Sequence, residues 1–441
     1  MMQRPKRSIC RLILPVIFAL LVRASSAQTP ERFHQVVQPY ADAQMFMGSV
    51  LVAKNGKILF SKSYGMADLE WGVPDSSTTR FNIASMTKQF TAASILLLEE
   101  RGKLRTDDLV KKFIPDAPPA WDKITIYHLL THTSGISNSA ATYEPGPPEK
   151  LVLHDAPLNS QPGEKWEYTN LGYIVLGYLV EKISGETYEE FVQENIFKPL
   201  AMKDSGLISF VTVIPRRATG YWPGNSGIEN ADRPDPRYGF SAGALYSSTE
   251  DLLRWEEGIF GGKLLTPASL RKMTTPFKSD YGCGLYVHRV SGHLVIEHDG
   301  NNIGFNADMA YYPEEKLAVI VLANLNGTVT GEMTKALAAV AHGQTPPIPS
   351  IHKEITLSKG VLARYAGTYR FPQYILKMVP EGNHLLVKFD NGGTLAVFPE
   401  SETKFFSKPW PTQFQFSQNG SGEFTVLTRY EGEKEEKGAK E

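Results

Sequence analysis

Ser85 and Lys88 lie three residues apart at the start of an apolar helical pattern, within the stretch RFNIASMTKQFTAASILLLEERGKL. This spacing places both side chains on one face of a helix. The helix dipole disfavours a cation in the first turn, and burial would further favour the neutral amine. A neutral amine beside a hydroxyl can take its proton and activate the oxygen as a nucleophile. The alternative is a capping serine followed by a lysine whose amine reaches solvent.

The Ser-x-x-Lys spacing is a weak signal alone, because the chain contains it at three other places: Ser269 to Lys272, Ser350 to Lys353, and Ser401 to Lys404. Ser350 falls in a proline-rich segment and Ser401 among short predicted strands. Ser269 begins a helix, but the lysine that follows it can point to solvent. Only Ser85 precedes a long apolar helix.

A second motif is Tyr168-Thr169-Asn170, in the stretch KWEYTNLGY, and Tyr-x-Asn occurs nowhere else in the chain. It follows a loop rich in glycine and proline and precedes a helical pattern. A tyrosine there can relay a proton, and Asn170 can hydrogen-bond a substrate amide or the lysine. The alternative is that Tyr168 packs in the core while Thr169 or Asn170 caps the helix.

A third motif is His298-Asp299-Gly300, in the stretch EHDGNNIGF. It ends a predicted strand, and a glycine at this point lets the backbone approach a ligand closely. The alternative is a hairpin turn that contains an incidental histidine. Lys54-Asn55-Gly56 also has a basic residue two positions before a glycine, but it forms a hairpin turn ahead of Ser85.

Taken in order, the three motifs resemble those of the penicillin-recognising serine hydrolases. This family includes class C β-lactamases, D-alanyl-D-alanine carboxypeptidases, penicillin-binding proteins, and related esterases and D-aminopeptidases. The phrases FNIASMTKQFTA, ITIYHLLTHTSGI and GFSAGALYSSTEDLLRW look familial too, and the likeness spans about residues 33–342. It is specific for the family and says little about the substrate.

The resemblance implies a catalytic role for each matching residue. Ser85 would be the acylated nucleophile, and Lys88 and Tyr168 would share the base and acid work. Asn170 would bind the substrate and the lysine. The THTSGI stretch, which contains His132, would shape the fold rather than catalyse.

The third motif would complete the substrate site. By the resemblance, the backbone N–H groups of Ser85 and of Asn301, which follows Gly300, form the oxyanion hole. His298 would replace the lysine that faces a substrate carboxylate, as a weaker or pH-dependent cation. This departure from the family pattern favours the esterase or peptidase branches over strong β-lactamase activity.

The elements that must position these residues can be read from the patterning. An alternating stretch around Asn55-Gly56 predicts a hairpin over 48–68, and residues 280–325 read as successive antiparallel strands. We expect helices at 84–101, 171–185 and 248–260. The sheet that opens the chain would therefore resume near its end, giving an α/β (α+β) fold. By the resemblance, this is a β-lactamase/transpeptidase-like antiparallel sheet flanked by helices, with a helical insertion.

The expected domain organisation has five parts. Residues 1–27 form a signal peptide, 28–342 the hydrolase domain, 343–354 a proline-rich linker, 355–430 a small all-β barrel-like domain, and 431–441 a charged, disordered tail. Exposed aromatic residues of the β domain, such as Trp410 and Phe414, could bind a ligand, although core packing is the favoured role.

Composition limits the function further. The signal segment has a basic start, an apolar run from Leu12 to Val22 and small residues before a plausible cleavage point, which predicts export to the periplasm or the medium. The rest of the chain has no apolar segment long enough to span a membrane. It carries 41 basic residues (46 less the 5 in the signal) against 47 acidic ones, so no nucleic-acid partner is expected. Cys283 is then the single cysteine, which excludes an internal disulfide, and no metal or other cofactor is expected.

The sequence therefore predicts an exported serine hydrolase that cleaves an ester or amide through an acyl-enzyme on Ser85. Its substrate would be a small ester, a D-amino-acid peptide or a peptidoglycan fragment, with weak or no β-lactamase activity. One alternative is a penicillin-binding or sensor protein that acylates but turns over slowly, and another is a class C-like β-lactamase. A non-catalytic binding module would require all three motifs to be relics.

Overall fold

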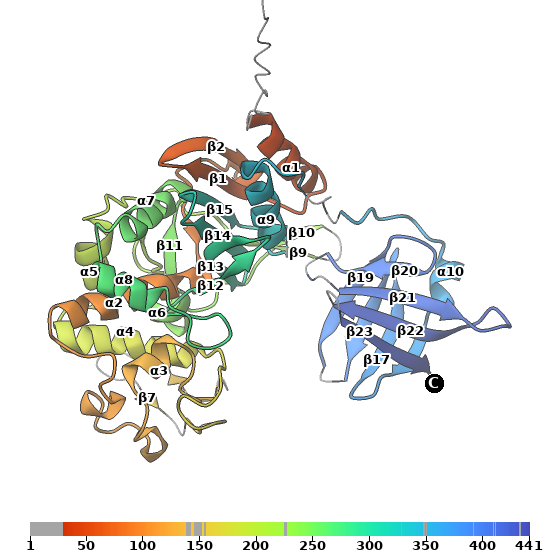
Figure 1. Cartoon of the computed structure of the whole chain (residues 1–441). Helices are drawn as coiled ribbons and strands as arrows, with labels where there is room; N and C mark the ends of the chain where they lie inside the picture. Colours follow the sequence, from red (N-terminus) through yellow and green to blue (C-terminus); the bar gives the residue numbers. More distant parts are fainter. Residues whose placement is uncertain are drawn as a thin grey trace, which may run out of the picture.

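The computed structural model describes residues 30–137, 143–144, 152–153, 156–224, 227–327, 329–346, 349, 351–390, 392–408, 410, 412–431 and 434–441. The predicted signal peptide, residues 1–27, lies outside the described residues. Figure 1 shows a helix-and-sheet body followed by a separate β-barrel.

A six-stranded antiparallel sheet forms the centre of the body, in the order β12-β13-β14-β15-β1-β2. Its strands are β1 (Gly48–Lys54), β2 (Lys57–Tyr64), β12 (Tyr286–Val290), β13 (His293–Asn302), β14 (Phe305–Tyr312) and β15 (Leu317–Ala323). The first strand pairs with the last, from Gly48 opposite Ala323 to Lys54 opposite Leu317. This confirms the predicted sheet that opens the chain and resumes after the helical insertion.

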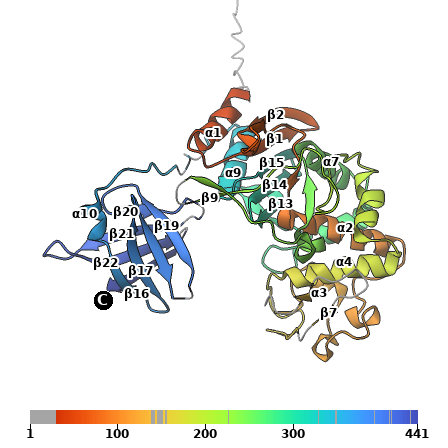
Figure 2. The ribbon, with the colours of Figure 1, turned by 180° about the vertical axis from the view of Figure 1, so that it is seen from behind.

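Helices cover both faces of the sheet, and for this reason every residue of β15 is buried. Two helices, α1 (Pro30–Asp42) and α9 (Val329–Ala341), pack together and share one apolar core with one face. The other core contains the insertion, whose helices are α2 (Thr87–Glu100), α3 (Ile126–Leu130), α4 (Asn170–Ser184), α5 (Tyr188–Val192), α6 (Phe240–Gly243), α7 (Thr249–Phe260) and α8 (Pro267–Met273). Figure 2 shows these helices from the opposite side.

The three predicted helices are confirmed as α2, α4 and α7. The first predicted helix begins with a separate turn of 3-10 helix, η1 (Ala84–Met86), before α2. Twelve consecutive residues of α2, Thr87 to Leu98, are buried, so this helix runs through the core rather than over the surface. Ser85 and Lys88 thus belong to different helices that follow each other directly.

Short elements complete the body. Small sheets are formed by β3 (Met66–Asp68) with β4 (Val73–Pro74), by β5 (Phe81–Asn82), β11 (Leu245–Ser247) and β8 (Gly206–Leu207), by β6 (Tyr143–Glu144) with β7 (Val152–Leu153), and by β9 (Tyr221–Pro223) with β10 (Ile228–Asn230). Single turns of helix are η2 (Val110–Lys112), η3 (Pro119–Trp121), η5 (Gln193–Phe197) and η6 (Pro236–Tyr238).

The C-terminal strands close into a barrel, as the spacing of the short strands predicts. They follow the short helix α10 (Lys359–Ala363) and are β16 (Gly367–Arg370), β17 (Ile375–Glu381), β18 (His384–Phe389), β19 (Thr394–Pro399), β20 (Lys404–Phe406), β21 (Thr412–Gln418), β22 (Phe424–Glu431) and β23 (Lys434–Lys440). Phe414 is fully buried in the barrel core, whereas Trp410 is 43% exposed and packs against Trp222 of β9.

The prediction of a disordered tail over residues 431–441 is wrong. Residues 434–440 form β23, which pairs with β22 along its length and with β16 at Tyr369 and Arg370. The strand is mostly exposed, so its charged side chains reach solvent while its backbone closes the barrel. In the part of the chain that the structure describes, no helix has the length and apolar character needed to span a membrane.

Candidate active site

Ser85 lies in η1, at the edge of a cavity of about 440 Å³. The residue before it, Ala84, has a φ of +46°, an uncommon conformation for a residue with a side chain. Two hydrogen bonds hold this strained turn: the Ala84 N–H donates to Asn82 Oδ1 (2.7 Å), and the Ile83 N–H donates to the Leu245 carbonyl (3.0 Å). Stored strain of this kind is common where a fold fixes a reactive group.

The Lys88 side chain is completely buried, and its Nζ has three oxygen neighbours. These are Ser85 Oγ at 3.0 Å, Asn170 Oδ1 at 2.9 Å and the Ala242 carbonyl at 2.7 Å. An ammonium group could donate to all three. A neutral amine could donate to the amide and carbonyl oxygens, which can only accept, and receive the Ser85 O–H on its lone pair.

Burial lowers the pKa of Lys88 to about 7, against an opposing effect of the Asp299 carboxylate. No carboxylate forms an ion pair with this amine within the described residues. The neutral amine is therefore accessible near neutral pH, and this is the form that can accept the serine proton.

Tyr168, the first residue of the second motif, is largely buried and lies beside Lys88 of the first. Its ring lies 4.2 Å from the ring of His132 and 4.8 Å from Lys88 Nζ. Burial raises the pKa of the Tyr168 phenol above its usual value, although a hydrogen bond with Ser85 partly offsets this. At neutral pH the group is therefore a neutral O–H that can donate a proton, not a phenolate base.

His132 supports this tyrosine. It is fully buried, and its Nδ1 accepts a hydrogen bond from the Thr169 N–H (3.2 Å), while its carbonyl accepts one from the Glu167 N–H (2.8 Å). Burial also lowers the pKa of the imidazole well below its ordinary value. The residue thus orients the second motif, in agreement with the prediction that it shapes the fold.

Asn170 is the first residue of α4, and its side chain lies at the cavity. Because its Oδ1 accepts from Lys88, the amide orientation that this bond requires presents Nδ2–H to other groups. The first two motifs are therefore in direct contact across 82 positions of sequence.

Gly300 of β13 lies against the turn that carries Ser85. A Cβ atom at this position would stand 2.3 Å from the Ile83 carbonyl oxygen, so no larger residue fits without a shift. The next residue, Asn301, lines the cavity together with Ser85. The structure thus brings both residues of the expected oxyanion hole to one cavity.

The expectation that His298 faces the substrate as a cation is wrong. The side chain is 2% exposed and does not line the cavity. Its Nδ1 lies 2.6 Å from the Asp299 carbonyl, which can only accept, so this nitrogen carries the proton and Nε2 accepts from the Tyr281 hydroxyl at 3.1 Å. Burial lowers the pKa of His298 to about 4, and the ring is neutral near pH 7.

Two groups of the site were not predicted from the sequence. The Ala242 carbonyl is the third neighbour of Lys88, and the Tyr281 hydroxyl holds His298. Ala242 lies in the stretch GFSAGALYSSTEDLLRW, whose resemblance to the family could have indicated that this segment belongs to the site. Tyr281 had no such signal.

The second Ser-x-x-Lys that starts a helix has an ordinary structural role. Ser269 follows the cap of α8, with its N–H bound to Thr266 Oγ1 at 3.4 Å. Lys272 forms an ion pair with Glu99 at 2.6 Å and does not contact the serine. This pair therefore offers a matched control for Ser85 and Lys88.

A separate cluster of His293, Glu315 and His342 places its ligand atoms within 4.8 Å of one another, the one such group among the described residues. A 2.7 Å contact between His293 Nδ1 and Glu315 Oε1 accounts for part of the cluster without an ion. It lies at the end of β13 away from Gly300, so it has no part in the Ser85 site.

Comparison with known proteins agrees with this geometry. A family model described as Beta-lactamase matches residues 33–343. A penicillin-binding protein of Bacillus subtilis (strain 168) is 27% identical over 432 residues, covering 90% of this chain and 95% of its own.

Solved structures are similar as well. The crystal structure of a penicillin binding protein from Bacillus halodurans has a TM-score of 0.62 and 30% identity, and covers 70% of this chain and 98% of its own. That of a D-amino acid amidase from Ochrobactrum anthropi SV3 has a TM-score of 0.63 and 22% identity, with 71% and 98% covered, and its likeness concerns the fold. The chain belongs to the Beta-lactamase family, and the protein is a serine hydrolase.

Proposed function

We propose that the protein is an exported hydrolase that cleaves an ester or amide through an acyl-enzyme on Ser85. The observation that carries this proposal is the 3.0 Å contact between Ser85 Oγ and the buried Lys88 amine, whose pKa is lowered to about 7. Catalysis by a general base is most effective when its pKa lies near the working pH.

Acylation follows from this arrangement. Lys88 takes the proton of Ser85, and the serine oxygen attacks the substrate carbonyl carbon. The negative charge that develops on the carbonyl oxygen is stabilised by the backbone N–H groups of Ser85 and Asn301. The Tyr168 hydroxyl donates its proton to the leaving alcohol or amine as the C–O or C–N bond breaks, and recovers one from Lys88.

Deacylation uses the same groups in reverse. Water attacks the acyl-Ser85 ester, a base of the site takes its proton, and the acid product leaves with Ser85 protonated again. Asn170 holds the lysine throughout and offers its amide to the substrate.

We propose an ester or a peptide containing a D-amino acid as the substrate, with β-lactam hydrolysis weak or absent. The fold shared with a D-amino acid amidase supports the first part. The neutral, buried His298 supports the second, because it leaves the third motif without a cation for the β-lactam carboxylate.

The alternative is a penicillin-binding or sensor protein that acylates but deacylates slowly, and the names of two similar proteins favour it. A class C-like β-lactamase is the other candidate within the family.

Export to the periplasm or the medium is supported by the signal-peptide pattern of residues 1–27. N-terminal sequencing of the protein recovered outside the cytoplasm tests it, and an intact N-terminus would contradict cleavage.

Intact-mass spectrometry with a fluorescent penicillin and a p-nitrophenyl ester separates these functions. Rapid ester turnover that is lost in Ser85→Ala but retained in the control Ser269→Ala supports the hydrolase. A stable penicillin adduct on Ser85 with little turnover of either compound supports the penicillin-binding alternative. Equal turnover by Ser85→Ala and the wild type would overturn the proposed nucleophile.

A further inference from the structure

Three side chains of the kinds that bind metal ions come together at the end of β13 away from Gly300. His293 is the first residue of β13, Glu315 lies in the turn between β14 and β15, and His342 directly follows α9. One ligand atom of each lies within 4.8 Å of the other two. The residues are 22 and 27 positions apart (315 less 293, and 342 less 315), so the fold and not a short motif assembles the cluster.

The Glu315 carboxylate is close to both imidazole rings. Its Oε1 lies 2.7 Å from His293 Nδ1 and 3.9 Å from His342 Nδ1. In a tetrahedral zinc site, with bonds of about 2.0 to 2.2 Å, two ligand atoms are about 3.4 Å apart. The two observed separations lie on either side of this value. Side-chain shifts of less than about 1 Å would therefore bring both pairs of atoms to the separation that zinc requires.

The contacts inside the cluster leave polar atoms unused. The His342 side chain is only 7% exposed, and its Nε2 is buried with no hydrogen-bond partner among the described residues. Glu315 Oε2 is buried in the same condition. Burying unpaired polar atoms destabilises a fold, and a cation bound to both side chains would offset this cost.

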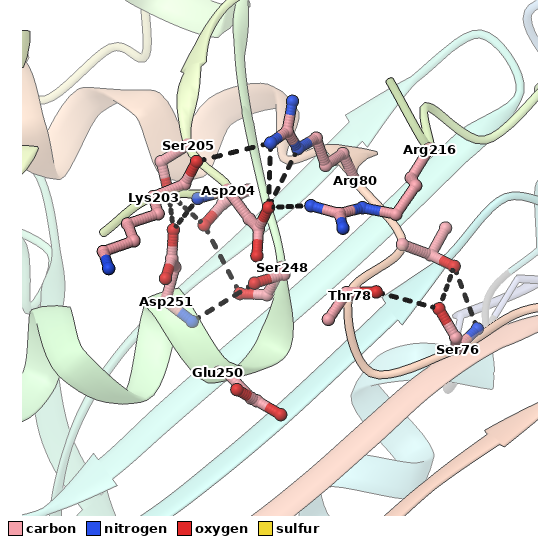
Figure 3. A network of polar contacts seen from close by, with 12 residues as sticks. Ser76, Thr78, Arg80, Lys203, Asp204, Ser205, Arg216, Ser248, Glu250 and Asp251 are labelled. Atoms are coloured by element: carbon pink, nitrogen blue, oxygen red, sulfur yellow. Dashed lines mark hydrogen bonds and ion pairs between the residues drawn. The ribbon is translucent and has the colours of Figure 1, made fainter. Parts of the chain in front are cut away.

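The polar network around Asp204 is closed in comparison (Figure 3). Asp204 Oδ1 accepts hydrogen bonds from Arg80 and Arg216, at 2.8 and 2.5 Å. Asp251 Oδ2 accepts from the Asp204 N–H and the Ser205 hydroxyl, at 2.6 and 2.9 Å. Within the part of the chain that the structure describes, neither aspartate has a buried side-chain oxygen without a partner. Donors of the protein itself satisfy these carboxylates, so this network needs no ion.

The electrostatic surroundings of the cluster act in both directions. Burial lowers the pKa of His342, and the neighbouring His293 lowers it further, while Glu315 opposes this and Lys54 adds to it. The neutral imidazole is the form that ligates metals. The charge of Lys54 would repel a bound cation, whereas the carboxylate of Glu315 would attract it directly.

We propose that His293, Glu315 and His342 bind a zinc ion, with water as the fourth ligand, and that the ion ties the end of α9 to the sheet. Two imidazoles and a carboxylate suit Zn²⁺. This site goes beyond the proposed function, and it departs from the expectation, drawn from the scattered histidines, that the protein binds no metal.

Ion binding requires one rearrangement. The rings of His293 and His342 are stacked, with centroids 3.8 Å apart and planes 17° from parallel. A metal lies in the plane of the imidazole that binds it, so at least one ring turns about its Cβ–Cγ bond when the ion enters. This torsion has a broad range of accessible angles in histidine, which keeps the cost of the turn small.

Zinc binding to the untagged protein tests the proposal. After metal is stripped with EDTA and the chelator removed, affinity is measured by competition with a chromophoric chelator. We expect one Zn²⁺ per chain, bound about tenfold or more weakly by His342→Ala and Glu315→Gln. His288→Ala should bind as the wild type does: His288 Nε2 also lies 2.7 Å from a glutamate oxygen, Glu297 Oε1, but no third ligand joins this pair among the described residues.

Thermal unfolding separates loss of a ligand from loss of the fold. Zn²⁺ should raise the melting temperature of the wild type and of His288→Ala, and should leave that of His342→Ala unchanged. In EDTA the three proteins should unfold at similar temperatures. If His342→Ala does not fold, His293→Gln, whose side chain is 27% exposed, replaces it in both measurements. A wild type that binds no stoichiometric Zn²⁺, or a control that loses binding as the ligand variants do, would overturn the site.

Discussion

The proposed chemistry of this site depends on one buried amine. Lys88 has the three oxygen neighbours that a neutral amine can satisfy, and burial brings its pKa to about 7. Burying a lysine destabilises the fold, but under the proposed function it gives Lys88 a pKa suited to a base beside Ser85.

We expect the acylation rate constant to fall tenfold per pH unit below about 7 and to level off above it, because Lys88 must lose its proton first. Lys88→Ala should lower the rate by roughly 10²- to 10⁴-fold. Stopped-flow measurement of the p-nitrophenol burst checks both. The control Lys272→Ala, from the other helical Ser-x-x-Lys, should retain the rate. A flat pH profile or a fully active Lys88→Ala would contradict the base.

The lowered pKa of Lys88 should also change how the free energy of unfolding depends on pH. Between about 7 and 10.5 the unfolded chain keeps a proton on Lys88 that the folded protein has lost. The unfolded state binds more protons there, so the free energy of unfolding rises with pH over this window. Urea unfolding of the wild type and Lys88→Met should show the wild type gaining relative stability between these pH values. If the free energies of unfolding of the wild type and Lys88→Met changed with pH in parallel, Lys88 would not have a lowered pKa in the folded protein.

The contact of Ser85 with Lys88 was predictable because the two residues lie three positions apart where η1 leads directly into α2. The contact of Lys88 with Asn170 was expected only from the family resemblance, because it joins residues 82 positions apart. The charge of His298 was not predictable, since the protonation of a strand residue depends on its burial and partner. That partner is Tyr281, seventeen positions earlier, and no local sequence pattern predicts their contact. The charge of a histidine is thus a property of the fold, not of the motif.

At the scale of elements, the site depends on how closely β13 approaches η1. Gly300→Ala should lower both activity and melting temperature, because a Cβ would stand 2.3 Å from the Ile83 carbonyl oxygen and push the strand away from Ser85. Kinetics and thermal unfolding measure the two effects. Gly327→Ala is the control, since its Cβ would meet its nearest neighbour, the Met45 carbonyl, at an ordinary 3.7 Å. If Gly300→Ala had the activity and melting temperature of the wild type, β13 would be able to shift away from η1 without cost, and their close approach would not be required.

The helices of the body were predicted correctly from the sequence, whereas the last strand of the barrel was not. The long apolar periodicity of α2 and α4 was sufficient to place both helices within a few residues. The segment KEEKGAK of β23 was misread because its charges look like those of a solvated tail. A strand needs only its backbone groups to pair, and Gly438 packs against the Phe371 ring, where a Cβ would come within 2.5 Å. Composition alone could not reveal these partners.

The whole molecule joins a catalytic body to a barrel with its own apolar core. Trp410 of the barrel segment packs on Trp222, with ring centroids 5.7 Å apart. Trp222 belongs to β9, whose partner β10 leads into residues 231–233 of the cavity wall. The barrel segment therefore touches the β9–β10 hairpin, which leads into the cavity wall.

The integrity of the barrel should depend on the last eight residues. Deleting 434–441 removes β23 and leaves the exposed edges of β16 and β22 unpaired, so we expect faster amide exchange in both strands and a greater tendency to aggregate. Hydrogen exchange read by mass spectrometry measures the first effect and light scattering the second. The control Lys434→Gln with Lys437→Gln changes the charge but keeps the strand, and should preserve protection. Unchanged protection of β16 and β22 in the deletion would mean that the barrel holds without its closing strand, and that these residues act as the tail their charge suggests.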